Sequence, residues 1–469
     1  MADELQGPGN SAHQLQGTTL PVGMLSPAAG RRTRRIIAED PSWSLTVVPP
    51  LTKLCLQHIV TNFERNPILN ELLPSHRAPV LEMLPPQLPL NVTAGLVDDE
   101  GYWQRCCVQR WPACDVSAYG HSWKRMYLER HLENAIELFV PDVTDLRSVL
   151  GLVPLSKDYV RRLNISQLLP PIKEPEEDDG SDSGSDTSFN GPSLDHFDFG
   201  VLLDKLPMLE ELHLVYGVHG CGMNFNWNLF EFTYRDCQAL GVALKSCLTL
   251  KVFRIHQSKV DDEKCRLLVK CLLDHPSLRE LDLSHNLIGD GGARAVGKLL
   301  NRSKLERLNL CDNAVCGAGG QAIGHALLAN GVLTHLNLRL NRLRDEGGRA
   351  ITQALLSNRT LEFLHLGSNQ LTEATATVLS QVFVQNSILE TVNLSCNRLG
   401  VEGGKALEQG LMCNGTVLAC DLRLTEVSLE SEGHVKQILQ ENQVRARMTR
   451  IRSPAFPGTP AEVPLSQNQ

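Results

Sequence analysis

Between residues 278 and 397 the chain repeats one pattern, in which leucines alternate with polar residues and an asparagine closes each copy. The five copies read LRELDLSHN, LERLNLCDN, LTHLNLRLN, LEFLHLGSN and LETVNLSCN. The closing asparagines are Asn286, Asn313, Asn341, Asn369 and Asn397, which are 27 or 28 residues apart. A fixed period of this length indicates a stack of similar structural units.

The alternating part of each copy predicts a short strand, because L-x-L places the leucines on one face and the intervening residues on the other. Segments between the copies, such as GGARAVGKLL and GGRAITQALL, carry apolar residues at steps of three and four, the period of a helix. Each unit is therefore a strand, a turn and a helix. The pattern is that of leucine-rich repeats. It predicts an α/β solenoid of the ribonuclease-inhibitor-like kind, with repeats of about 28 residues, parallel strands inside and helices outside.

The asparagines and glycines of the repeats are predicted to shape the backbone. An asparagine side chain can satisfy main-chain groups in the turn that leaves the strand, where no neighbouring strand offers a partner. We therefore assign a structural role to the five closing asparagines. The glycine pairs Gly291-Gly292, Gly319-Gly320, Gly347-Gly348 and Gly403-Gly404 are expected to let the chain turn tightly into each helix.

Two regions are predicted ahead of the solenoid. Residues 1–30 are rich in Gly, Pro, Ser and Gln and are expected to be disordered. Residues 31–157 carry helical apolar patterns broken by prolines, which predicts a small, mainly helical domain. This domain holds an arginine cluster at residues 31–35 and four of the five tryptophans, Trp43, Trp103, Trp111 and Trp123.

The solenoid is predicted to span residues 158–442. Degenerate copies of the repeat opening at Val160, Leu209, Leu250 and Val417 extend the array beyond its five regular units. Residues 174–186, EPEEDDGSDSGSD, contain seven acids and no base, which predicts an acidic disordered loop over residues 174–192. Residues 443–469 are predicted to form a flexible basic tail.

Composition excludes several classes of function. The formal charge of −8 and the pI near 6.0 argue against a general nucleic-acid binder. No run of 18 apolar residues is present, so no membrane span is expected. Fourteen cysteines without a secretory signal or a C-x-x-C pair favour reduced thiols in the cytoplasm. The sequence suggests no cofactor, metal or catalytic residues.

The outward positions of the strands supply the candidate functional site. The middle position of each L-x-L gives Arg254, Asp282, Asn309, Asn337, His365 and Asn393, and Arg339 lies in the next outward position. These side chains are mixed in charge and mostly short and polar. A protein that binds the phosphate backbone of a nucleic acid would carry clustered Lys and Arg on this face, and a cofactor site would need convergent apolar walls. A protein-binding concave face is the favoured interpretation, with a merely solvated sheet face as its alternative.

Two other functions remain open at this point. Arg339 could act as the arginine of a GTPase-activating protein, since such an arginine stabilises a transferring phosphate. DDEGYWQRCCVQRWP and SWKRMYLERHL resemble the later part of F-box segments, which would indicate a substrate receptor of a ubiquitin ligase.

A family resemblance rests on strings outside the repeats. RRIIAEDPSWSL, DDEGYWQRCCVQRW, SWKRMYLERHLEN, CGMNFNWNLFEFTYRDC and SKVDDEK, ahead of repeats ending NLIGDGG, resemble the leucine-rich-repeat subunits of the dynein regulatory complex. The resemblance runs from about residue 31 to about residue 442.

This resemblance implies a non-enzymatic scaffold of the nexin–dynein regulatory complex. Such a subunit would help regulate dynein-driven microtubule sliding in the axoneme of motile cilia and sperm flagella. Its partners would be other subunits of the complex and axonemal proteins, with tubulin as a further candidate. The tryptophans and arginines of residues 31–157 further suggest that this region anchors the chain to the complex, since interfaces are enriched in these residue types.

Overall fold

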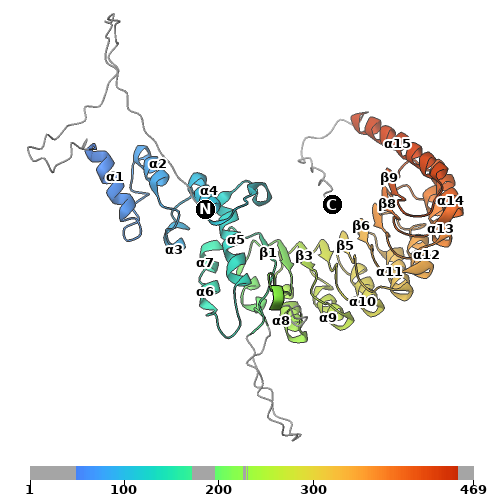
Figure 1. The fold of residues 1–469 in the computed structure, drawn as a ribbon, viewed down its shortest axis with the longest axis horizontal. Coiled ribbons are helices and arrows are strands. Elements are labelled where there is room, and N and C mark those ends of the chain that lie inside the picture. The colour runs from blue at the N-terminus through green and yellow to red at the C-terminus, as the bar shows by residue number, and fades with distance from the viewer. Residues whose placement is uncertain (1–48, 172–195, 225–228, 230, 453–469) are drawn as a thin grey trace, which may run out of the picture. The chain divides into compact units, whose positions relative to one another are not determined.

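The computed structural model describes residues 49–171, 196–224, 229 and 231–452 (Figure 1). The chain divides into two compact units, Met1–Leu84 and Pro85–Gln469. The predicted disordered segment at residues 1–30 and the predicted acidic loop at 174–192 lie outside the described residues. In the first unit, α1 (Leu51–Thr61) contacts α2 (Pro74–Met83).

The second unit begins with short helices and turns. They are α3 (Leu90–Thr93), α4 (Glu100–Arg110), η1 (Val116–Tyr119), α5 (Trp123–Glu137), α6 (Arg147–Leu150) and α7 (Val153–Ser156). Helix α4 starts where the Asp99 carboxylate accepts a hydrogen bond from the Tyr102 N–H, and α5 starts where the Ser122 hydroxyl accepts one from the Arg125 N–H. Both are N-caps, which satisfy donors that the first helical turn leaves free.

Nine strands of the described residues form one parallel sheet, in which each strand pairs with the next along the chain. They are β1 (Arg162–Ile165), β2 (Glu211–Leu214), β3 (Val252–Ile255), β4 (Glu280–Asp282), β5 (Arg307–Asn309), β6 (His335–Asn337), β7 (Phe363–His365), β8 (Thr391–Asn393) and β9 (Ala419–Asp421). Equivalent residues of consecutive units lie side by side, for example Leu308, Leu336 and Leu364.

Helices connect the strands and line the outer side of the curved sheet (Figure 1). They are η2 (Phe199–Val201), η3 (Leu203–Lys205), η4 (Gly222–Asn224), α8 (Tyr234–Ser246), α9 (Asp262–Leu272), α10 (Asp290–Leu300), α11 (Gly317–Ala329), α12 (Arg344–Ala354), α13 (Glu373–Gln385), α14 (Gly400–Met412) and α15 (Leu429–Arg452). The repeat leucines point between sheet and helices, where Leu336 and Leu338 are fully buried. The predicted leucine-rich-repeat solenoid is therefore confirmed.

The glycine pairs do not have their predicted role. They lie inside the first turns of α10, α11, α12 and α14 and do not adopt left-handed backbone conformations. Instead they allow neighbouring helices to approach, since a Cβ on Gly320 would lie 2.6 Å from the Cα of Gly347. The left-handed turns fall on the residue before each closing asparagine, such as Leu340 with φ of 56°.

The start of the solenoid unit also differs from the prediction. The compact unit begins at Pro85, whereas the sequence suggested a boundary at residue 157. The reason is that α5 packs on the first strand. Leu132 and Ile136 of α5 lie in the same hydrophobic core as Leu163 of β1.

The predicted flexible tail starts too early. Residues 443–452 continue α15, and residues 453–469 lie outside the described part of the chain. Val435 and Leu439 bury one side of this helix, and the amide nitrogen of Asn442 donates to the carbonyls of Asn414 and Val417. Beyond Asn442 the sequence contains no helix breaker until Pro454, so the helix continues past its last buried residue.

Candidate functional site

The register of the sheet brings the predicted site residues into one row on its concave face. Arg254, Asp282, Asn309, Asn337, His365 and Asn393 are consecutive cross-strand partners. Neighbouring members can touch across strands about 4.8 Å apart, whereas Asp282 and His365 are separated by two further strands. Arg339 follows Asn337 by two residues and lies in a parallel row.

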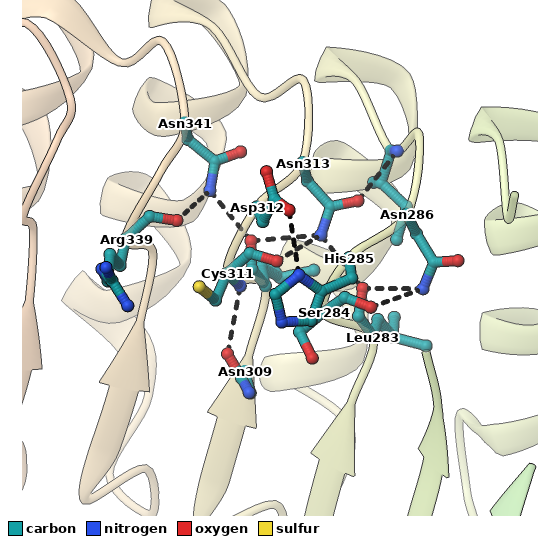
Figure 2. Close-up of polar contacts among 12 residues, drawn as sticks. Leu283, Ser284, His285, Asn286, Asn309, Cys311, Asp312, Asn313, Arg339 and Asn341 are labelled. Atoms are coloured by element: carbon teal, nitrogen blue, oxygen red, sulfur yellow. Dashed lines mark hydrogen bonds and ion pairs between the residues drawn. The ribbon is translucent and has the colours of Figure 1, made fainter. Parts of the chain in front are cut away.

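Most side chains of this row accept a hydrogen bond from the backbone N–H two residues further along, at the end of their own strand. The Asn337 side-chain oxygen accepts a hydrogen bond from the Arg339 N–H at 3.0 Å. The same bond joins Asp282 to Ser284, Asn309 to Cys311, His365 to Gly367 and Asn393 to Ser395, at 2.9 to 3.2 Å. Figure 2 shows the bond between Asn309 and Cys311. The acceptor atoms of the row are therefore partly used within the fold, which the sequence did not reveal.

Acidic side chains on the concave strands have internal partners. The Arg254 guanidinium donates to the Glu280 carboxylate, and the Asn309 amide nitrogen donates to Asp282 at 2.9 Å. At the far end, Asp421 accepts from Asn393 and forms an ion pair with Arg423 at 2.7 Å. These contacts leave few free acceptors on this face.

Arg339 and its neighbours form the most open part of the row. The Arg339 guanidinium makes no hydrogen bond or ion pair with the described residues. It borders a cavity of about 730 Å³ that His365 and Asn393 also line. Gly367 packs closely between two of the lining residues, since a Cβ there would lie 2.9 Å from the His365 ring and 3.0 Å from the Ser395 hydroxyl.

The His365 ring is neutral at physiological pH. Burial lowers its pKa to about 4, and the nearby charge of Arg339 acts in the same direction. Its Nδ1 accepts the Gly367 N–H, so the neutral ring carries its proton on Nε2, which makes that nitrogen a donor. The Phe363 ring lies beside it and is stacked on His335 with centroids 5.6 Å apart. The cavity is therefore lined by two donor groups, the Arg339 guanidinium and the His365 ring.

The closing asparagines join consecutive units. The Asn341 amide nitrogen donates to the carbonyls of Leu310, Leu338 and Arg339 at 2.9 to 3.2 Å, and its oxygen accepts from Val315. Figure 2 shows the bond to Arg339 and the equivalent contacts of Asn286 and Asn313. Asn369 and Asn397 form the same contacts one and two units later.

A second row of buried asparagines follows the ends of α11 to α14 and continues inside α15, and it was not predicted from the sequence. Its members are Asn330, Asn358, Asn386, Asn414 and Asn442, each 28 residues from the next. The Asn358 amide nitrogen donates to the carbonyls of Leu327 and Asn330, and its oxygen accepts from the Leu361 N–H. The signal was an asparagine three residues before the first leucine of a copy, as in Asn330 before Leu333.

Three glutamates on α5 cover the free edge of β1, and they were also missed. Glu129 accepts from the N–H groups of Arg161 and Arg162, Glu133 from that of Asn164, and Glu137 from that of Ser166. Four residues of a helix rise about 6 Å and two residues of a strand about 6.6 Å. The glutamates at every fourth position of α5 therefore stay level with the N–H groups at every second position of β1. The spacing E-x3-E-x3-E in ERHLENAIE was the available signal.

Covering the edge perturbs the carboxyl groups of Glu129 and Glu133. Burial raises the pKa of Glu133 to about 7, and burial also raises the pKa of Glu129. Both effects arise because a buried carboxylate loses hydration, which one hydrogen bond to Glu133 and three to Glu129 replace only in part.

The tryptophans expected at an interface are instead core residues where the structure describes them. Trp103 is 1% exposed and donates its ring N–H to the Val97 carbonyl at 2.8 Å. Trp111 is 8% exposed, with the guanidinium of Arg130 4.5 Å above its ring. Trp123 is half-buried, while Trp43 and the arginine cluster lie outside the described residues.

The described residues contain neither a metal-binding cluster nor a membrane-spanning helix. No group of three or more His, Cys, Asp or Glu side chains among them could hold a metal ion. None of the helices in the described ranges is long and apolar enough to cross a membrane.

Comparisons relate the chain to known proteins. A leucine-rich-repeat family model matches residues 274–297, 329–351, 357–374 and 385–407. Dynein regulatory complex subunit 5 of Macaca fascicularis is 57% identical over 272 residues, which are 57% of this chain and 54% of that protein. The protein of the same name from Chlamydomonas reinhardtii is 31% identical over 222 residues, 47% of this chain and 50% of that protein.

Among solved structures, an internalin of Listeria monocytogenes is 18% identical, covers 50% of this chain and 67% of that chain, and has a TM-score of 0.31. The chain spans about half the length of the curated relatives it matches. The repeated strands and asparagines give this chain a leucine-rich-repeat fold, which the family model matches in four segments, and 57% of the chain is similar to dynein regulatory complex subunit 5.

Proposed function

We propose that the chain is a non-enzymatic scaffold subunit of the dynein regulatory complex in the axoneme of motile cilia and sperm flagella. The observation that carries this proposal is the 57% identity over 272 residues to a protein named as a subunit of that complex. The protein of the same name from a green alga is 31% identical, so the similarity extends beyond mammals. In this role the chain binds other subunits and axonemal proteins, with tubulin as a further candidate, and acts without nucleic acid or membrane.

The geometry of the solenoid supports a scaffold. Two rows of asparagines tie each unit to the one before it, for example Asn341 to Leu310 and Asn358 to Leu327. Repeats joined in this way transmit position along the array, because each unit contacts only its neighbours. Partners held on the concave face would then be kept at fixed distances, which suits the regulation of dynein-driven sliding.

A non-enzymatic role fits how the concave side chains are used. Asp282, His365 and Asn393 accept hydrogen bonds from their own strand ends, so these acceptors act in folding. Asp282 and His365 lie three strands apart and do not form an acid–base pair. Arg339 belongs to a contact surface in this proposal.

The two alternative functions gain no support. The names of the relatives describe a subunit of the dynein regulatory complex, and the family model describes leucine-rich repeats. The F-box-like strings contain Trp103 and Trp111, whose burial gives them a role in the core.

The proposal can be tested by replacement. Ciliated cells that lack their own dynein regulatory complex subunit 5 would express the tagged full-length chain, and its location and ciliary beating would be recorded. We expect the chain to enter the axoneme and to restore beating. A chain that stays in the cell body, although it is expressed and folded, would contradict the proposal.

A further inference from the structure

We propose that the concave face between β5 and β8 binds an acidic segment of a partner protein, with Arg339 as its main contact. The inference rests on the proposed scaffold function and names the chemistry of one partner. It follows from three properties of this part of the face: unpaired arginines, donors that outnumber free acceptors, and a cavity beside them.

The first property is an imbalance of charge on the concave strands. Glu280, Asp282 and Asp421 each have an internal partner, as described above. Arg307 and Arg339 are exposed and form no ion pair with the described residues. Glu280 and Asp421 are each paired with an arginine, whereas Asp282 is bonded only to the neutral Asn309 amide and keeps its charge. The two unpaired arginines, Arg307 on β5 and Arg339 just after β6, outweigh that one carboxylate, so this part of the face is electropositive although the chain as a whole is acidic.

The second property is the identity of the free atoms. The side-chain oxygens of Asn337 and Asn393 accept hydrogen bonds from the N–H groups of Arg339 and Ser395. The Asn337 amide nitrogen, the His365 Nε2–H and the Arg339 guanidinium bond to none of the described residues. A surface that offers donors selects a ligand rich in acceptors, and carboxylates accept the strongest hydrogen bonds from a guanidinium.

The third property is space. The outward row that contains Arg339 continues through Gly367 and Ser395 to Arg423, so two small residues separate two arginines about 14 Å apart, at about 4.8 Å per strand. The cavity of about 730 Å³ is lined by both of these arginines and by Ser395. The carboxylate that also lines it, that of Glu432, forms an ion pair with Lys436 at 2.7 Å.

A protein segment fits these properties better than a nucleic acid does. A phosphate backbone is bound by rows of Lys and Arg, whereas this face has isolated arginines among neutral amides. An extended peptide with two or three acidic residues could place one carboxylate at Arg339 and another near Arg307.

Peptide binding tests the chemistry directly. Purified full-length chain would be titrated with fluorescein-labelled octaglutamate, with octaglutamine as the neutral probe. We expect octaglutamate to bind more tightly than octaglutamine, and Arg339→Glu to weaken its binding at least tenfold. Arg349→Glu, at an exposed position of α12, is the matched control and should leave binding unchanged. Equal binding of octaglutamate to wild type and Arg339→Glu, or no binding to wild type, would overturn the inference.

A second experiment identifies the segment in its natural setting. A photo-crosslinking benzoylphenylalanine would replace Ser395 beside the cavity, and the peptides captured in isolated axonemes would be sequenced by mass spectrometry. We expect a peptide rich in Asp and Glu. Capture of a basic or apolar peptide overturns the inference but leaves the proposed function intact, because the chain is then in the axoneme. A wild-type chain that binds octaglutamate but never enters the axoneme contradicts the proposed function alone.

Discussion

The carboxylate of Glu133 on α5 accepts a hydrogen bond from the backbone N–H of Asn164 on β1 at 2.7 Å. This contact covers the edge of a parallel sheet, where an unpaired strand would otherwise present free donors to other chains. Together with Glu129 and Glu137, Glu133 makes α5 the cap at the N-terminal end of the sheet. Repeat solenoids generally need a capping unit at each end.

The cap makes stability depend on pH. Burial raises the pKa of Glu133 from 4.5 to about 7, so the folded state binds the proton more tightly than the unfolded state. The contribution of protonated Glu133 is therefore fully present below about pH 4.5 and is lost as the pH rises through about 7. Glu133→Gln keeps an acceptor oxygen and removes the ionisation. We expect the variant to flatten this part of the stability–pH curve and to be at least as stable as wild type at pH 7.5.

Denaturant unfolding between pH 4.5 and 8 measures this effect. Glu390→Gln, at an exposed position, serves as the control and should follow wild type. A Glu133→Gln curve with the wild-type slope would show that this carboxyl does not titrate as described.

The repeat leucines should dominate stability. Leu336→Ala removes a fully buried side chain and is expected to cost about 2–5 kcal/mol in the free energy of unfolding. Leu328→Ala, at a position that is 55% exposed, should change it by less than about 0.5 kcal/mol. If both variants melt alike, the assignment of inward and outward positions is wrong.

The closing asparagines should matter more than those on the concave face. Asn341→Ala removes three hydrogen bonds to carbonyls that each keep one other donor, and it leaves the buried Val315 N–H without its acceptor. It should cost about 1–3 kcal/mol. Asn337→Ala removes one hydrogen bond at a half-buried position and should cost about 1 kcal/mol or less. Thermal unfolding of the two variants, measured side by side, would contradict this ranking if Asn337→Ala proved the more destabilised.

Helix packing gives a prediction with an internal control. Gly320→Ala places a methyl group 2.6 Å from the Cα of Gly347, so backbone must shift, at a cost of about 1–3 kcal/mol. Gly331→Ala meets no atom within 4 Å and should change stability little. Equal melting temperatures would mean that α11 and α12 are less closely packed than the structure shows.

The regular parts of the fold could be predicted because they follow from local pattern. A period of 27 or 28 residues and alternating leucines determine the strands, the helices and the inward positions. The closing asparagines, such as Asn341, could be assigned because the turn needs a partner for its backbone. The concave row could be placed by register alone, since every second residue of a strand shares a face.

What could not be predicted depends on contacts between distant segments. Glu133 reads as a surface residue in its own helix, and only its position beside β1 gives it a buried partner. Trp111 reads as an interface residue until Arg130 and the surrounding core cover it. The glycine pairs were assigned to turns because the sequence does not state the distance between neighbouring helices.

Catalysis is not expected. If Arg339 is a contact residue, the purified chain should neither hydrolyse nucleotide nor accelerate GTP hydrolysis by small GTPases. The assay is single-turnover GTP hydrolysis with and without the chain. A rate gain that disappears in Arg339→Ala would favour an activator function instead.

The central claim is that this chain is a scaffold within the dynein regulatory complex. Crosslinking mass spectrometry on isolated axonemes that carry the full-length chain tests it most directly. The account predicts crosslinks from the compact unit that contains the solenoid, within residues 85–452, to other subunits of that complex, in the same positions across replicate preparations. Axonemes in which the chain is absent, or in which it crosslinks only to proteins outside the complex, would contradict the account.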